Sequence, residues 1–123
     1  MLNKKFNILT EYDMDYDLYS IVIDDEFKFN KSIEIEEGII LDFDENMFPF
    51  AIEIIDASRK LKINKQELNN AKVHIKIESN SDIVKILISF YYKINNLKIE
   101  KDINSKLANN FNIPSMVTVL ATI

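Results

Sequence analysis

The most regular part of the chain is KVHIKIESNSDIVKILISFYYKINNLKIEKDI, residues 72–103. Apolar and polar residues alternate through three runs within it, with β-branched and aromatic side chains at the apolar positions, and this pattern is typical of half-buried strands. Asn80-Ser81 and Asn95-Asn96 separate the runs. Because Asn tolerates the positive φ of two-residue hairpin loops, the pattern predicts an antiparallel meander. Its strands span residues 72–79, 82–94 and 97–103.

The two loops fix which residues oppose one another, and every predicted pair is apolar. The pairs are Val73 with Ile88, Ile75 with Ile86, Ile77 with Val84, Ile94 with Leu97, Tyr92 with Ile99 and Ile88 with Ile103. Each large aliphatic side chain contributes ~2 kcal/mol when it is fully buried, so the resulting apolar face must be covered. We expect the cover to be a short helix, the N-terminal strands or a second copy of the chain.

A second hairpin is predicted upstream, within residues 36–58. If Asp44 closes against Pro49 around a loop of residues 45–48, one register aligns all the apolar side chains. The resulting pairs are Phe43 with Phe50, Leu41 with Ile52 and Ile39 with Ile54. A slip of one residue would turn these side chains to the wrong face. Pro49 suits the first position of a strand.

The remaining segments predict short elements. Asn64, with Glu67 three residues later, resembles a capping box and predicts one or two helical turns between Ser58 and Leu68. Residues 105–111 are predicted to form a short helix before Ile113-Pro114, and residues 116–123 a last strand. The sequence thus predicts a single α+β domain over residues 1–123, mainly an antiparallel sheet built from hairpins and a meander.

Residues 36–58 also carry a family resemblance. Its motifs are Gly38, Asp42-x-Asp44, Ile52-Glu53-Ile54 and Ala57-Ser58, preceded by Tyr12-Asp13, Asp17 and an apolar run to Ile23. Over residues 11–58 the chain resembles the prokaryotic domain-of-unknown-function family numbered 2283. The resemblance implies a small domain without an assigned activity and gives no residue a role. Met47 and Ala51 stand where that family has Gly, and a positive φ at either residue would carry a steric cost.

Composition excludes several classes of function. The chain has no Cys and one His, so disulfides, thiol nucleophiles and the usual zinc ligands are missing. Gly38 is the only glycine, which excludes glycine-rich phosphate loops. No apolar run approaches the ~20 residues that span a bilayer, and the N-terminal residues lack the pattern of a signal peptide. We therefore expect a cytoplasmic protein.

The two halves of the chain carry opposite charge. Residues 1–56 hold four Lys and fifteen acidic residues, 4 − 15 = −11, whereas residues 57–123 hold eleven Lys or Arg and five acidic residues, 11 − 5 = +6. One interpretation is a nucleic-acid-facing half. The other, which we favour because the chain is acidic overall, is that the halves neutralise one another within a chain or across a dimer.

Clustered carboxylates suggest a divalent-cation site. Asp42, Asp44, Asn46 and Glu53 follow the ligand spacing of a calcium-binding EF-hand loop. Met47 replaces the glycine of that loop, and strands flank it instead of helices, so we take the match as accidental. Asp42, Asp44 and Glu53 stay the candidate metal ligands in some other geometry. The alternative is a solvated acidic face.

Asp13, Asp15 and Asp17 alternate, so on a strand they would lie on one face. Beside Asp42 and Asp44 they would form a cluster able to hold Mg²⁺ or Ca²⁺. The alternative is that these carboxylates protect a strand edge and favour solubility.

The polar face of the predicted meander carries His74, opposite Leu87. The spacing gives His74 neither a serine nor a carboxylate partner, so we do not expect a catalytic base there. Four lysines share the face, with Lys76 beside Lys85 and Lys93 beside Lys98. Such pairs are unfavourable unless an anion or an acidic surface lies between them. These four residues are the candidate anion-binding site.

Tyr91 faces outward beside the lysines. Its ring would allow single-stranded nucleic acid to stack on this face. A single outward aromatic residue is thin support for such a surface, and we expect neither a nucleic-acid nor a membrane partner.

The sequence predicts a non-catalytic binding or self-association module without a cofactor. Its partner would be a second copy, forming a homodimer, or an unidentified protein. The alternatives are a domain or enzyme that binds a divalent cation through Asp42, Asp44 and Glu53, and a domain that binds an anion or nucleic acid through the basic C-terminal sheet face.

Overall fold

The computed structural model describes residues 2–121, in which nine strands and two short helices are assigned. The strands are β1 (Leu2–Asp13), β2 (Leu18–Ile23), β3 (Phe29–Glu36), β4 (Ile39–Asp44), β5 (Pro49–Ile54), β6 (Lys72–Ser79), β7 (Ile83–Ile94), β8 (Leu97–Ala108) and β9 (Met116–Ala121). The helices are α1 (Ala57–Leu61) and α2 (Lys65–Asn69). The chain is therefore mostly β, as the sequence predicts. No helix in the described range is long and apolar enough to cross a bilayer.

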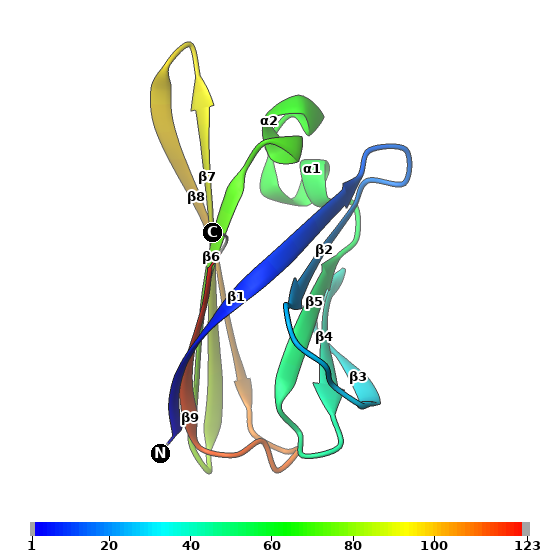
Figure 1. The fold of residues 1–123 in the computed structure, drawn as a ribbon, viewed down its shortest axis with the longest axis vertical. Coiled ribbons are helices and arrows are strands. Elements are labelled where there is room, and N and C mark those ends of the chain that lie inside the picture. Colours follow the sequence, from blue (N-terminus) through cyan, green and yellow to red (C-terminus); the bar gives the residue numbers. More distant parts are fainter. Residues whose placement is uncertain (1, 122–123) are drawn as a thin grey trace.

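The strands form one sheet in the order β3-β4-β5-β2-β1-β9-β6-β7-β8. Neighbours are antiparallel except β1 and β9, which run parallel. The sheet curls into two layers, one made of β2 to β5 and the other of β6 to β9, and β1 crosses from one layer to the other (Figure 1). The N-terminal half of β1 pairs with β9, and its C-terminal half pairs with β2.

The core lies between these two layers. Ile75, Ile88 and Phe90 from the predicted meander are almost fully buried. Tyr19 of β2 meets Phe90 edge to face across the core, with ring centroids 5.4 Å apart. The N-terminal strands therefore cover the apolar face of the C-terminal strands, with α1 and α2 at one end (Figure 1). The apolar face does not need a second copy of the chain to cover it.

The register of β7 and β8 is the predicted one. Tyr92 pairs with Ile99 and Ile94 with Leu97. Asn95 and Asn96 connect the strands with φ values of 50° and 66°, the left-handed conformations that two-residue loops with the right twist require.

The predicted register of β6 and β7 is wrong by two residues. Ile75 pairs with Ile88, and Ile77 with Ile86. The cause is Asn80, whose side-chain oxygen accepts hydrogen bonds from the backbone N–H groups of Asp82 and Ile83 at 2.8 and 2.9 Å. This local turn lengthens the loop. A shift by an even number keeps the same side chains in the core.

The β4–β5 pairing agrees with the prediction except at its closed end. Leu41 pairs with Ile52 and Ile39 with Ile54, but a bulge places Phe43 opposite Pro49. The predicted pair of Phe43 with Phe50 is therefore wrong. Phe50 instead stacks on Phe27, with centroids 5.3 Å apart.

Of the helical predictions, the turns between Ser58 and Leu68 are confirmed as α1 and α2, whereas the later helix is wrong. Residues 105–108 continue β8, which pairs with β7 to its end, so no helix forms over residues 105–111. Asn64 does occupy the N-cap position of α2, but its side chain makes no capping hydrogen bond. The predicted last strand is present as β9, and residues 122–123 lie outside the described residues.

Candidate ligand pocket beside α2

Strands β6 and β7 differ in length, and this difference leaves one end of the sheet open. The β6–β7 ladder begins with Lys72 paired to Tyr91, whereas β7 continues to Ile94 and pairs there with β8 alone. The β7–β8 end therefore projects beyond β6, next to α2 (Figure 1). The exposed edge of β7 and the side of α2 face a common space.

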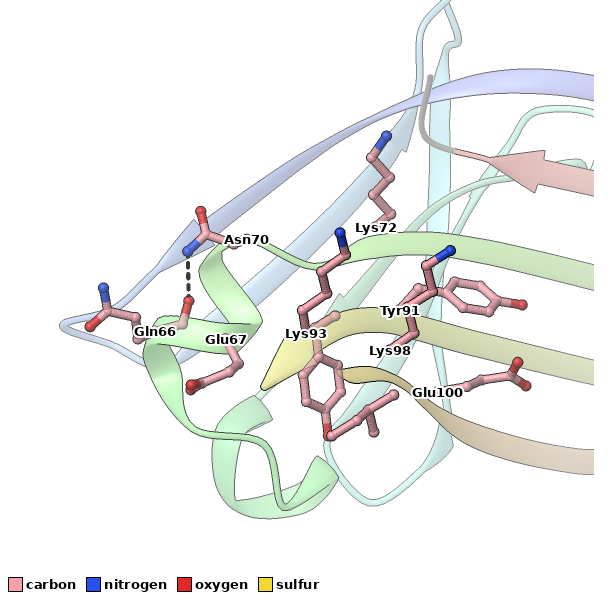
Figure 2. Close-up of a pocket in the computed structure, with 10 residues that line it drawn as sticks. Gln66, Glu67, Asn70, Lys72, Tyr91, Lys93, Lys98 and Glu100 are labelled. Carbon is pink, nitrogen blue, oxygen red and sulfur yellow. Dashed lines mark hydrogen bonds between the residues drawn. The ribbon is translucent and has the colours of Figure 1, made fainter. Parts of the chain in front are cut away.

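Helix α2 is held in place by one buried side chain and by bonds at its end. Leu68 is fully buried. The backbone N–H of Asn70 donates to the carbonyl oxygens of Glu67 and Leu68, and its side-chain amide donates to the Gln66 carbonyl at 3.0 Å (Figure 2). A helix of five residues is not stable alone, so this packing positions its polar side chains at the open end of the sheet.

A pocket of about 710 Å³ occupies this space. Helix α2 and three strands contribute its lining. The lining residues are Gln66, Glu67, Asn70, Lys72, Tyr91, Tyr92, Lys93, Lys98, Ile99 and Glu100 (Figure 2). This volume lies within the range of small-molecule sites in proteins.

The pocket contains three lysines without acidic partners. In the described part of the chain the ion pairs are Arg59–Asp56 and Lys76–Glu78, so Lys72, Lys93 and Lys98 have none. Their side chains project to the same side of the strands, and the carboxylates of Glu67 and Glu100 point away from them (Figure 2). The amino groups therefore form a local concentration of positive charge on an acidic protein.

Neither acidic residue of the lining neutralises these lysines. Glu100 makes no ion pair among residues 2–121, and its pKa is raised by the neighbouring Asp102, through a hydrogen bond that requires a shared proton and through the negative charge of Asp102. One oxygen of Glu67 is buried and has no hydrogen-bond partner among the described residues. Each carboxylate is thus engaged or enclosed elsewhere.

The four predicted anion-binding lysines do not form one group. Lys76 pairs with Glu78 at 2.7 Å, and Lys85 lies opposite Glu78 across the β6–β7 ladder. The hydrogen bond and charge of Lys76, with a smaller effect of Lys85, lower the pKa of Glu78. The predicted contact of Lys76 with Lys85 is therefore wrong, because the corrected register puts Glu78 there.

The other predicted lysine pair is present. Lys93 lies opposite Lys98 on β7 and β8. Lys72 joins this pair and was not among the predicted lysines. Its signal in the sequence was the alternation, which places Lys72 on the same strand face as His74 and Lys76, but the observed register is needed to put it opposite Tyr91, two residues before Lys93.

The predicted metal ligands are not brought together as a set of three. Asp42 lies beside Glu53. Burial has the largest effect in raising the pKa of Glu53, followed by the hydrogen bond and the charge of Asp42. Asp44 instead accepts hydrogen bonds from the backbone N–H groups of Asn46 and Phe48 in the connecting turn. Among residues 2–121, no group of three or more acidic or His side chains is arranged to hold a metal ion.

The predicted alternation of Asp13, Asp15 and Asp17 on one strand face is wrong. Strand β1 ends at Asp13, and Asp15 lies in a turn. Asp17 accepts hydrogen bonds from the Tyr12 hydroxyl at 2.5 Å and from the backbone and side chain of Ser58 at 2.9 and 2.7 Å. It connects the β1–β2 turn to α1 and is not part of an acidic cluster.

His74 lies opposite Ser89, and Ser89 lies opposite Asp102, so the predicted neighbour Leu87 is wrong. Ser89 stands between the other two residues, whereas a catalytic serine needs the histidine next to both serine and carboxylate. Ser89 is also buried, and no hydrogen bond joins these three side chains in the described region. His74, Ser89 and Asp102 are the residue types of a catalytic triad, but they do not have its geometry.

Comparison with known proteins identifies two archaeal relatives. The chain is 30% identical over 110 residues to a protein of Methanosarcina mazei named "Putative hypoxanthine phosphoribosyltransferase". The aligned residues cover 88% of this chain and 89% of that protein. It is 34% identical over 92 residues to a Methanocaldococcus jannaschii protein named as uncharacterized, covering 74% and 77% of the two chains. No family model matches the chain, and no solved structure matches it.

Proposed function

This chain belongs to the same protein family as the Methanosarcina mazei protein, and we propose that it is a non-catalytic binding module with its ligand site beside α2. The observation that carries the proposal is the pocket of about 710 Å³ at the open end of the sheet. It combines hydrogen-bonding groups, an apolar surface and unpaired positive charge. These are the components of a small-molecule site.

The arrangement of reactive groups favours binding over catalysis. A general base must reach the group that it deprotonates and needs a partner that orients it. His74 lies outside the pocket lining. The pocket contains no serine, threonine or histidine to act as a nucleophile or base with a partner.

The name of the Methanosarcina mazei relative provides the enzymatic alternative. A hypoxanthine phosphoribosyltransferase would have to hold a purine base together with a phosphoribosyl donor. Gly38 is the only glycine of this chain, so the chain cannot form the glycine-rich backbone loop that binds phosphate in phosphate loops. We therefore propose that the pocket binds a ligand without transferring a phosphoribosyl group.

An activity assay tests the non-catalytic part of the proposal. Purified protein is incubated with hypoxanthine, phosphoribosyl pyrophosphate and Mg²⁺, and inosine monophosphate is measured by chromatography. We expect no product above the protein-free reaction. Product that increases in proportion to protein concentration, and that decreases in Lys93→Gln/Lys98→Gln, would contradict the proposal.

A fragment screen tests the binding part. Neutral, anionic and cationic aromatic fragments are added to ¹⁵N-labelled protein, and backbone amide shifts are recorded. We expect at least one fragment to shift residues 66–72 and 91–100 together, because these segments line the pocket. Shifts confined to other regions would place the ligand site elsewhere.

Self-association stays a prediction. The main argument for a second copy was an uncovered apolar face, and the N-terminal strands already cover that face. Light scattering at known protein concentrations would measure the oligomeric state directly.

A further inference from the structure

We propose that the pocket beside α2 binds a small phosphate monoester that carries an aromatic group. This inference rests on the proposed function and adds the chemical class of the ligand. The phosphate would lie among Lys72, Lys93 and Lys98, and the aromatic group would lie against Tyr91, which shares their face of the strands.

The three lysines of the pocket carry like charges that repel one another. Lys93 and Lys98 lie directly opposite each other on neighbouring strands, and like charges in such pairs destabilise a sheet. Lys72 adds a third positive charge, and none of the three forms an ion pair within residues 2–121. An anion bound among them would replace repulsion with attraction.

The three lysines match a phosphate group in charge and in number of donors. A phosphate monoester carries about −1.5 to −2 charges at pH 7 and three strong acceptor oxygens. Each lysine offers ammonium donors on a flexible stem, and the three come from β6, β7 and β8. Three separate donor groups thus suit three oxygens better than the two oxygens and single charge of a carboxylate.

The pocket also has room and an exposed aromatic side chain next to the lysines. The cavity of about 710 Å³ is far larger than a phosphate ion needs. Tyr91 is 42% exposed and lies on the same face of the strands as Lys93 and Lys98, whereas Tyr92 and Ile99 line the pocket from the core-facing side. Aromatic rings bind other rings by offset or edge-to-face contact, so Tyr91 suits a planar group attached to the phosphate.

Charge also sets an upper limit on the size of the ligand. The chain has a formal net charge of −5, and residues 1–56 carry most of the acidic groups. A long polyanion would meet these carboxylates beyond the pocket, and only three lysines would contact its phosphates. We therefore infer a small ligand and not a nucleic acid.

Isothermal titration calorimetry of the intact chain tests the inference with four compounds. Adenosine 5′-monophosphate and phenyl phosphate contain both a phosphate and a ring, inorganic phosphate lacks the ring, and adenosine lacks the phosphate. We expect at least one of the two monoesters to bind at least tenfold more tightly than both inorganic phosphate and adenosine.

Substitutions test the role of the lysines. Lys93→Gln/Lys98→Gln should weaken monoester binding by at least tenfold, because the charged hydrogen bonds from both ammonium groups to the phosphate are lost. Lys72→Gln, which leaves the β7–β8 pair intact, should also weaken binding. The matched control is Lys106→Gln, an exposed lysine of β8 outside this pocket, which should bind like the wild type.

Each contrary outcome overturns the inference. Equal binding of adenosine and adenosine 5′-monophosphate would show that the lysines do not recognise a phosphate. Inorganic phosphate that binds as tightly as both monoesters would remove the aromatic requirement, and no binding of any compound would remove the ligand class. The proposed function would still stand if the fragment screen located another ligand in the pocket, so the two failures are distinguishable.

Discussion

Asp17 shows how a residue that resembles part of a binding cluster can have a structural role. Its backbone takes a φ of 53°, a conformation that Asp tolerates better than most residues. Its carboxylate accepts three hydrogen bonds, from the Tyr12 hydroxyl and from the backbone and side chain of Ser58. The β1–β2 turn is thereby attached to the beginning of α1.

We predict that Asp17→Asn lowers the free energy of unfolding by about 1–2 kcal/mol at pH 7, because bonds to a charged acceptor become bonds to a neutral one. Urea unfolding measures the change. Asp15→Asn is the matched control, since Asp15 is exposed in the same turn. An equal loss in both variants would contradict the role given to Asp17.

The pH dependence of this effect has a defined sign. Burial raises the pKa of Asp17, but the hydrogen bonds from Tyr12 and Ser58 outweigh burial, so the pKa lies below its usual value. The carboxylate therefore stabilises the fold above its unfolded pKa of about 3.9, and this contribution is lost as the pH falls through the folded pKa. The difference between wild type and Asp17→Asn should shrink as the pH falls below about 4.

At this scale the sequence predicted residue types better than residue roles. Asp42 and Glu53 do lie together, because the β4–β5 register was predicted correctly over that part of the hairpin. Asp17 was misassigned because its partner, Ser58, is far away in the sequence. Met47 takes a φ of 59° although it is not glycine, which local preference alone would not predict.

At the scale of elements, two connections on one end of the sheet are joined by Asn109. Its side-chain amide donates to the carbonyls of Asn80 and Ile113 at 2.7 and 2.8 Å, and its side-chain oxygen accepts from the Ile113 N–H at 3.0 Å. Asn109 thus ties the β6–β7 loop to the segment between β8 and β9.

We predict that Asn109→Ala lowers the free energy of unfolding by about 2 kcal/mol. Three hydrogen bonds are lost, and the backbone groups of Asn80 and Ile113 lose their side-chain partner. Thermal or urea unfolding measures the loss. Asn110→Ala is the matched control, since the neighbouring Asn110 is exposed. A similar loss in the control would indicate a general effect of the loop.

The success of each predicted strand pairing depended on its loop. The two-residue loop Asn95-Asn96 has the expected positive φ values, so its register was correct. The turn at Asn80 is made by a side chain and holds two extra residues, which the same rule could not detect. Residues 105–111 were predicted as a helix that ends before Ile113-Pro114, whereas pairing along the full length of β7 makes residues 105–108 a strand.

At the scale of the whole molecule, β1 joins the two layers. Ile8 pairs with Ile23 of β2, directly after the residues of β1 that pair with β9. Its side chain is 3% exposed. The opposite charges of the two halves contribute little, because the ion pair between the halves in the described region is the local, exposed Arg59–Asp56 pair. Apolar burial therefore holds the layers together.

We predict that Ile8→Ala lowers the free energy of unfolding by about 2–5 kcal/mol, the usual cost of such a cavity. Because both layers depend on β1, hydrogen exchange should accelerate together in β4–β5 and in β6–β7. Leu9→Ala is the matched control, since Leu9 is 54% exposed and should change stability by at most about 0.5 kcal/mol. Exchange that accelerates in only one layer would show that the layers unfold independently.

The pocket itself could not be predicted from the sequence. Its lysines were partly selected, because Lys93 and Lys98 face each other across a correctly predicted loop. The pocket also requires β6 to start at Lys72 and α2 to pack beside β7. These are tertiary relationships between segments that no local pattern encodes.

The parallel pairing of β1 with β9 affects how the chain folds while the ribosome synthesises it. Leu2 pairs with Met116, so β1 is synthesised before β9 and lacks this neighbour until the more than one hundred residues between them have been translated. Closing so long a loop is slow, and an unpaired strand edge invites association with other chains. A nascent polypeptide stalled before β9 would present that edge and become a substrate for chaperones.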